Sequence, residues 1–136
     1  MYNHSNGYEV SLEDYEQSAI KNVKKFRGLF ITEDFETFSY PFGIASNRIQ
    51  NIVRKYSRCV RTTNRGINFG NINVHLLKAF SLYGHGEEFG LIKSAIQFTI
   101  NRNGWHNLYT HDISANPSLF GCNPEYFEKV VEFSVN

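Results

Sequence analysis

Hydrophobic residues recur at a spacing of three to four residues in four segments, and this pattern predicts four helices. The four segments are residues 11–26, 46–56, 87–104 and 123–135. Start signals accompany three of them. Ser11 and Asp14 form a capping-box pattern, and Ser46 and Asn123 are residue types that favour the N-cap position. The third segment is marked instead by acidic residues in its first turn and by Gly104 as a stop signal.

Between these helices lie short runs rich in aromatic and β-branched residues, which predict strands. The runs are "TFSYPFG" (37–43), in which Pro41 and Gly43 stop a short strand and predict a turn, "RCVRTT" (58–63), "LLKAFSLYG" (76–84) and "WHNLYTH" (105–111). Strands that alternate with helices favour parallel pairing with crossover helices, so we expect an α/β fold, either an open sheet or part of a barrel. In such folds functional side chains lie at the C-terminal ends of strands. The polar clusters predicted there are "NHSNG", "YPFG", "RTTNRG" and "YTHD".

Composition and charge narrow the possible partners. The chain has 136 residues, of which 41% are hydrophobic, so we expect a single domain over residues 1–136. The net charge of +1 gives no overall field that would attract nucleic acid or a membrane surface. The N-terminus lacks a signal-peptide pattern and no apolar run is long enough to span a membrane, which predicts a cytoplasmic protein. The two cysteines follow no metal-binding spacing and are expected to be reduced and buried.

One histidine stands out in the segment "NLYTHDI", residues 107–113, because His111 and Asp112 follow a predicted strand directly. A histidine at a strand end is more often a hydrogen-bonded structural group than a catalyst. Its imidazole, with a pKa near 6.5, nevertheless suits a proton donor, and the carboxylate of Asp112 would tune it.

Three short motifs, taken together and in order, resemble the polysaccharide deacetylases, a carbohydrate esterase family. His4 and Ser5 match the start of the family's metal-binding motif H-[ST]-x-x-H, with Tyr8 where the second histidine would stand. The segment "SYPFG", residues 39–43, matches the proline motif that shapes the substrate groove. The last motif, a hydrophobic residue followed by x-His-Asp, is matched by residues 109–112.

The resemblance implies a partial or distorted (β/α) barrel with mostly parallel strands. It also implies metal-dependent hydrolysis of N-acetyl or O-acetyl groups on amino-sugar glycans, with His4 as a ligand of zinc or another divalent metal. His111 and Asp112 would be catalytic, with His111 protonating the leaving amine. The substrate-binding residues implied are Tyr40, Pro41, Phe42, Gly43, Arg61 and Tyr109. Tyr109 would line the pocket for the acetyl methyl group.

Two parts of the family pattern are missing, namely the upstream motif that carries a catalytic aspartate and the closing C-terminal strand. The sequence therefore suggests a truncated domain whose open strand edges favour a homodimer. Two functions remain open at this point. One is a deacetylase of acetylated amino-sugar polysaccharides, and the other is a catalytically inert relative that binds carbohydrate or another partner. Single-stranded nucleic-acid binding through Arg58, Arg61 and Arg65 is a weaker alternative, because the chain is nearly neutral and has no RNA-binding motif.

Overall fold

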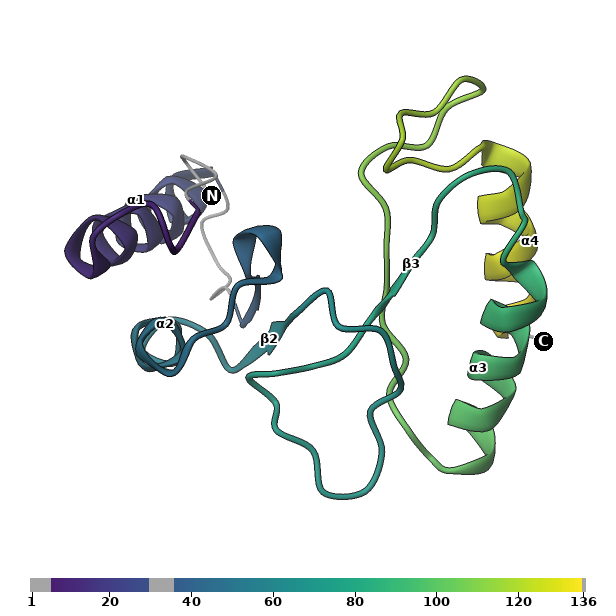
Figure 1. Ribbon diagram of the computed structural model, residues 1–136, viewed down its shortest axis with the longest axis horizontal. Coiled ribbons are helices and arrows are strands. Elements are labelled where there is room, and N and C mark those ends of the chain that lie inside the picture. The colour runs from purple at the N-terminus through teal and green to yellow at the C-terminus, as the bar shows by residue number, and fades with distance from the viewer. Residues whose placement is uncertain (1–5, 30–35, 136) are drawn as a thin grey trace. The chain divides into compact units, whose positions relative to one another are not determined.

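The computed structural model describes residues 6–29 and 36–135, and these form a mixed α/β structure (Figure 1). Within those ranges there are four α-helices, four short strands and one turn of 3-10 helix. The helices are α1 (Leu12–Leu29), α2 (Asn47–Val53), α3 (Phe89–Asn101) and α4 (Pro124–Val135). The strands are β1 (Thr37–Ser39), β2 (Cys59–Arg61), β3 (Phe80–Ser81) and β4 (Leu108–Tyr109), and the 3-10 turn η1 spans Pro41–Gly43.

The chain divides into two compact units. Unit 1 comprises Met1–Thr63 and Asn73–Leu77, and unit 2 comprises Asn64–Ile72 and Lys78–Asn136. The chain therefore passes between the units three times, after Thr63, Ile72 and Leu77. The single domain expected from the sequence stays a prediction, and each unit is described by itself below.

Unit 1 contains a parallel strand pair joined by a crossover helix. β1 pairs with β2 in the register Thr37↔Cys59 to Ser39↔Arg61, and α2 connects the two strands. The other edge of β2 is paired with the segment 74–77, since the Val60 amide donates to the Val74 carbonyl (2.8 Å). β2 thus lies in the centre of this small sheet, with β1 on one side and the segment 74–77 on the other.

The helices of unit 1 start where the sequence predicts. The Ser11 hydroxyl accepts a hydrogen bond from the Asp14 amide (3.0 Å), which confirms the predicted capping interaction at α1. The Ser46 hydroxyl caps α2 by accepting from the Ile49 amide. The core beneath both helices consists of Tyr15, Tyr40, Ile49, Ile52, Val53 and Val60.

Unit 2 repeats the same strand–helix–strand arrangement. β3 pairs with β4 in parallel, Phe80 opposite Leu108, and α3 is the crossover helix. α3 and α4 lie side by side (Figure 1) and enclose a core with the strands. That core consists of Phe80, Leu82, Ile92, Ala95, Ile96, Cys122, Tyr126 and Val130.

The start of α4 agrees with the sequence prediction, whereas the stop signal of α3 lies one residue earlier than predicted. The Asn123 side chain accepts a hydrogen bond from the Tyr126 amide (2.9 Å), which confirms Asn123 as the N-cap of α4. At the end of α3, however, the left-handed position is taken by Asn103 (φ 48°), one residue before the predicted stop at Gly104. Asparagine tolerates this conformation better than other residues with a side chain.

These findings confirm an α/β structure with parallel strands and crossover helices. In the described part of the chain the strands form two separate pairs and no closed barrel. None of the described helices has the length and apolar character needed to cross a lipid bilayer.

Candidate functional site

The residues implied by the deacetylase resemblance fall into two groups. Tyr40, Pro41, Phe42, Gly43 and Arg61 belong to unit 1, whereas Tyr109, His111 and Asp112 belong to unit 2. The structure brings each group together within its own unit. His4, the proposed metal ligand, lies outside the described residues.

In unit 2 four aromatic rings meet at the C-terminal ends of β3 and β4. Tyr83 follows β3 and contacts Tyr109, the last residue of β4, with ring centroids 5.8 Å apart. Tyr83 also contacts Phe120 (5.8 Å) and His111 (6.4 Å), and the His111 and Phe120 rings lie 5.5 Å apart. We call these four residues the strand-end cluster.

The strand-end cluster is open to solvent. His111 and Phe120 are exposed, with Phe120 at 50%, while Tyr83 and Tyr109 are half-buried. The shared contacts with Tyr83 place Tyr109 and His111 on the same side of the chain, as expected for residues two apart in an extended segment. The cluster therefore presents ring surface and a solvent-accessible imidazole together.

Asp112 anchors the loop that carries part of this cluster. Its carboxylate accepts hydrogen bonds from the Ser118 hydroxyl and the Ser118 amide (3.1 Å), and these bonds hold the pKa of Asp112 below its usual range. The loop is closed by two further backbone bonds, from the His111 amide to the Phe120 carbonyl (3.0 Å) and from the Cys122 amide to the Asp112 carbonyl (2.9 Å). Asp112 thus positions His111 and Phe120 through the loop backbone.

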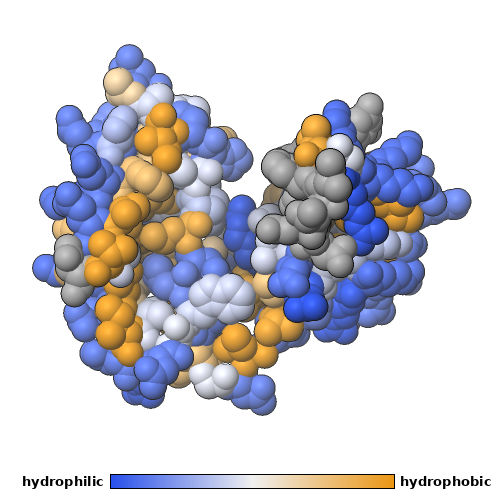
Figure 2. Space-filling model, turned by 180° about the vertical axis from the view of Figure 1, so that it is seen from behind, coloured by the Kyte–Doolittle hydropathy of each residue, from blue (hydrophilic) through white to orange (hydrophobic). Residues whose placement is uncertain are grey.

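An apolar slot of about 170 Å³ lies between β4 and α4. Its lining includes Leu108, Tyr109, Phe127, Val131 and Val135, but His111 is not among the lining residues. Figure 2 shows hydrophobic side chains gathered in a stripe on unit 2, consistent with the partial exposure of the three α4 residues. Because the wall is formed largely by α4 and core residues, the slot is a gap at the edge of the core. The role of Tyr109 against an acetyl methyl group stays a prediction.

In unit 1 the proline motif forms two overlapping tight turns after β1. The Gly43 amide donates to the Tyr40 carbonyl (2.9 Å), and the Ile44 amide donates to the Pro41 carbonyl (3.1 Å). Phe42 adopts a left-handed conformation (φ 55°, ψ 12°), which is uncommon for a bulky residue, and its side chain is 60% exposed. Gly43 is also left-handed (φ 72°), and it lies so close to Thr63 that no Cβ would fit.

Tyr40 and Pro41 are buried, so neither side chain is available to a substrate in this structure. Tyr40 is 3% exposed and its hydroxyl donates to the His75 carbonyl (3.1 Å). Burial raises the pKa of Tyr40 to about 12. Tyr40 is therefore a core residue that supports the turn, and the exposed members of the motif are Ser39 and Phe42.

Arg61 and Arg65, two of the arginines considered from the sequence, differ in their surroundings. Arg61, the last residue of β2, is half-buried and its guanidinium lies 3.4 Å from the Thr62 carbonyl. One guanidinium nitrogen of Arg65, Nη2, donates to both carboxylate oxygens of Glu88 (2.9 and 2.6 Å), and the guanidinium lies 5.7 Å from the centre of the Phe80 ring. Arg65 is thus engaged by Glu88, whereas the substrate-binding role of Arg61 stays a prediction.

The described residues do not form a metal site. In residues 6–29 and 36–135 no three histidine, cysteine, aspartate or glutamate side chains come together in an arrangement that could hold a metal ion. Tyr8, which takes the place of the second histidine of the metal motif, is 77% exposed. Among the described residues no donor set fits zinc, so we derive no chemical step through a metal ion.

Two members of the strand-end cluster, Tyr83 and Phe120, were not predicted as site residues. The signal for Tyr83 was available, because Tyr83 stands at the end of the predicted strand 76–84, directly before the turn residues "GHG" (84–86). Phe120 gave no such signal, since it comes to the cluster only when the loop 112–121 closes on itself.

Comparison with known proteins adds no identity: no family model, no curated protein and no solved structure matches this chain.

Proposed function

We propose that this chain binds amino-sugar glycans at the strand-end cluster of unit 2. The observation that carries the proposal is the meeting of Tyr83, Tyr109, His111 and Phe120 at the C-terminal ends of two parallel strands. This end of the strands is where α/β folds place their ligands.

The chemistry of the cluster suits a carbohydrate. The C–H faces of a sugar ring pack against aromatic rings, and the exposed ring of Phe120 offers such a surface. The imidazole of His111 can donate or accept a hydrogen bond with a sugar hydroxyl or an acetamide group beside that surface. Apolar surface next to directional polar groups is the usual composition of a small-molecule site.

The strand ends of unit 1 offer a similar combination. Phe42 is exposed after β1, and Arg61 ends β2 with a guanidinium that can bond to hydroxyl groups. The strained backbone of Phe42 adds to this argument, since left-handed non-glycine residues are enriched at ligand sites. We propose these two residues as a second sugar contact.

Deacetylation is the second candidate function, and the position of His111 favours it. A solvent-accessible imidazole at a strand end can protonate the leaving amine of an N-acetyl sugar. The resemblance to polysaccharide deacetylases supports the same role. Hydrolysis in that family also requires a metal ion, and the described residues supply no ligand set for it. We place glycan binding first because the ring contacts of the strand-end cluster support it directly.

Calorimetric titration with an N-acetylglucosamine tetramer tests the binding proposal. We expect saturable binding that survives EDTA and weakens about fivefold or more in Phe120→Ala and Tyr109→Ala. Phe98→Ala is the matched control, because Phe98 is similarly exposed (40%) in unit 2 but lies on α3 and outside the cluster. Absence of saturable binding, or equal weakening by Phe98→Ala, would refute the proposal.

Acetate release from the same tetramer in the presence of zinc tests the second candidate. If the chain is a deacetylase, His111→Gln should abolish release while weakening tetramer binding only about threefold, because glutamine keeps a hydrogen-bonding side chain but cannot act as the acid. Release that persists in His111→Gln would exclude His111 as the acid. Binding without any release identifies the chain as a carbohydrate-binding relative.

A further inference from the structure

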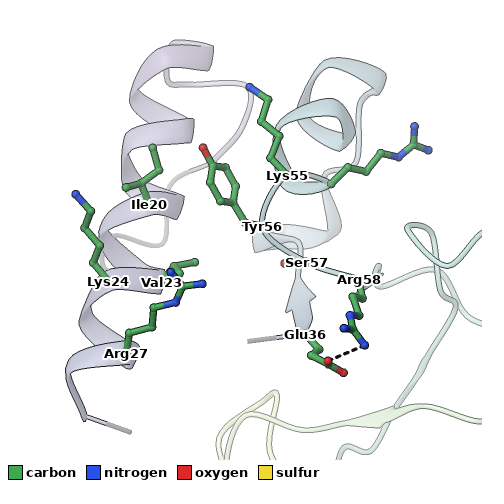
Figure 3. A pocket seen from close by; sticks show the side chains of 10 residues that line it. Ile20, Val23, Lys24, Arg27, Glu36, Lys55, Tyr56, Ser57 and Arg58 are labelled. Carbon is green, nitrogen blue, oxygen red and sulfur yellow. Dashed lines mark ion pairs between the residues drawn. The ribbon is translucent and has the colours of Figure 1, made fainter. Parts of the chain in front are cut away.

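We propose that unit 1 carries a second, separate ligand site, a basic pocket that binds a small organic phosphate. The pocket has a volume of about 540 Å³ and lies between the C-terminal half of α1 and the turn that follows α2 (Figure 3). This volume is within the range of small-molecule sites.

Five cationic residues and one acidic residue line the basic pocket. The cationic residues are Lys24, Arg27, Arg54, Lys55 and Arg58, and the acidic residue is Glu36. Lys24 and Arg27 come from α1, one turn apart, whereas the other three cationic residues come from the α2–β2 connection. In Figure 3 the Arg27 side chain extends from α1 toward the side of the pocket where Glu36 and Arg58 lie.

The charges in the pocket favour an anion. Lys55 is paired with Glu16 and Arg58 with Glu36, each at 2.8 Å, so these two pairs are close to neutral. Lys24 and Arg54 form no ion pair with any residue in the described ranges 6–29 and 36–135. The C-terminal end of α2 adds only about half a negative charge, which does not cancel the two positive charges of Lys24 and Arg54.

A ligand can replace Glu36 as the partner of Arg58 at little cost in free energy. Both side chains are largely exposed, at 80% and 52%, and exposed ion pairs contribute little to stability. Arg58 can therefore turn from the carboxylate of Glu36 to an incoming anion. A guanidinium binds phosphate oxygens through two parallel hydrogen bonds, which makes phosphate a good match for Arg27 and Arg58.

The remaining lining indicates an organic phosphate and not a bare anion. Ile20, Val23 and Tyr56 contribute an apolar wall, and Figure 3 shows the Tyr56 ring directed toward α1 across the pocket. The Tyr56 hydroxyl donates to Glu16 (2.9 Å), which fixes the ring in that position. A ligand with a ring and one or two phosphate groups would use both the wall and the cationic residues.

The basic pocket is distinct from the sugar contact proposed for unit 1. Glu36 directly precedes β1 and Arg58 directly precedes β2, so the pocket lies at the N-terminal ends of these strands. Phe42 and Arg61 lie at their C-terminal ends. The basic pocket and the sugar contact are therefore independent proposals, and an experiment that refutes one does not refute the other.

Titration of the full chain with uridine 5′-diphosphate in metal-free buffer tests this site, with uridine and inorganic phosphate as part-ligands. We expect saturable binding with a Kd below about 1 mM that weakens with added salt, weaker binding of inorganic phosphate, and none of uridine. The double variant Lys24→Ala/Arg27→Ala should weaken binding about tenfold or more. Both residues are exposed, so the substitutions remove charge and little packing.

The control is Lys21→Ala/Lys25→Ala, which removes two positive charges from the same helix at positions that do not line the pocket. It should leave the Kd within about twofold of the parent. Equal weakening by the two double variants would show a nonspecific charge effect and overturn the proposal. So would the absence of saturable binding, or binding of uridine as tight as that of the diphosphate.

Discussion

Two buried tyrosines in the core of unit 1 provide a sharp test of how polar groups are accommodated there. Tyr15 is 1% exposed and Tyr40 is 3% exposed, and both belong to the same cluster of core residues. The Tyr40 hydroxyl donates to the His75 carbonyl, whereas the Tyr15 hydroxyl has no hydrogen-bond partner among the described residues. Replacing each with phenylalanine removes one oxygen atom and keeps the ring.

The two substitutions should change the free energy of unfolding in opposite directions. A buried hydroxyl without a partner costs about 1–3 kcal/mol, so Tyr15→Phe should raise the free energy of unfolding by about 1 kcal/mol. Tyr40→Phe removes a hydrogen bond worth about 1 kcal/mol and should lower it by that amount. Because ring packing is unchanged in both variants, their free energies of unfolding should differ by about 2 kcal/mol, about half from the hydrogen bond lost in Tyr40→Phe and half from the unpaired hydroxyl removed in Tyr15→Phe.

Urea unfolding followed by far-ultraviolet circular dichroism measures this difference, since unit 1 contains the long helix α1. With a slope of about 1 kcal/mol per molar urea, the two midpoints should differ by about 2 M. Similar destabilisation by both variants would show that Tyr15 is also hydrogen-bonded in the folded protein. The reasoning from the unpaired hydroxyl would then be wrong.

Three further predictions concern pH and the loop of unit 2. Burial lowers the pKa of His106, so as the pH falls the unfolded chain binds the proton before the folded chain does. The free energy of unfolding should therefore fall as the pH drops below about 6.5. His106→Phe should reduce the loss of this free energy measured between about pH 7 and pH 5.5. Burial raises the pKa of Tyr40 and Tyr126 to about 12, so stability should fall as the pH rises above about 10, which alkaline unfolding curves would show. Gly121→Ala would place a Cβ against the Asp112 carboxylate and should cost about 1–3 kcal/mol. A double-mutant cycle should give a smaller cost in an Asp112→Ala background, and strict additivity would contradict the clash.

The helices could be predicted from the sequence because their start signals are local. Ser11, Ser46 and Asn123 all accept the capping hydrogen bonds that their residue types favour. The strands are shorter than predicted. In the segment 105–111 only Leu108 and Tyr109 belong to a strand, because Trp105 pairs instead with Asn68, far away in the sequence. Pairing of that kind leaves no local signal.

The candidate site was harder to predict, for two different reasons. Phe38 and Tyr40 are two residues apart, a spacing that puts side chains on the same face of a strand, and in the structure their rings contact each other at 6.2 Å against the core of unit 1. The family resemblance outweighed that signal and placed Tyr40 in the groove. Asp112 is different, because its bond to Ser118 depends on a six-residue loop closure that no short motif encodes.

The three passages of the chain between units 1 and 2 affect how a fragment or a recombined gene would behave. β2 needs the segment 74–77 for one of its edges, since Val60 and Thr62 donate to the carbonyls of Val74 and Leu77 (both 2.8 Å). A fragment that ends after Thr63 would contain the described helices α1 and α2 of unit 1 but would leave that edge of β2 bare and open to pairing with other chains. An exchange of gene segments at this boundary would therefore transfer an aggregation-prone sheet. A transfer that extends past Leu77 would also carry the segment 74–77, which supplies the backbone partners for that edge of β2.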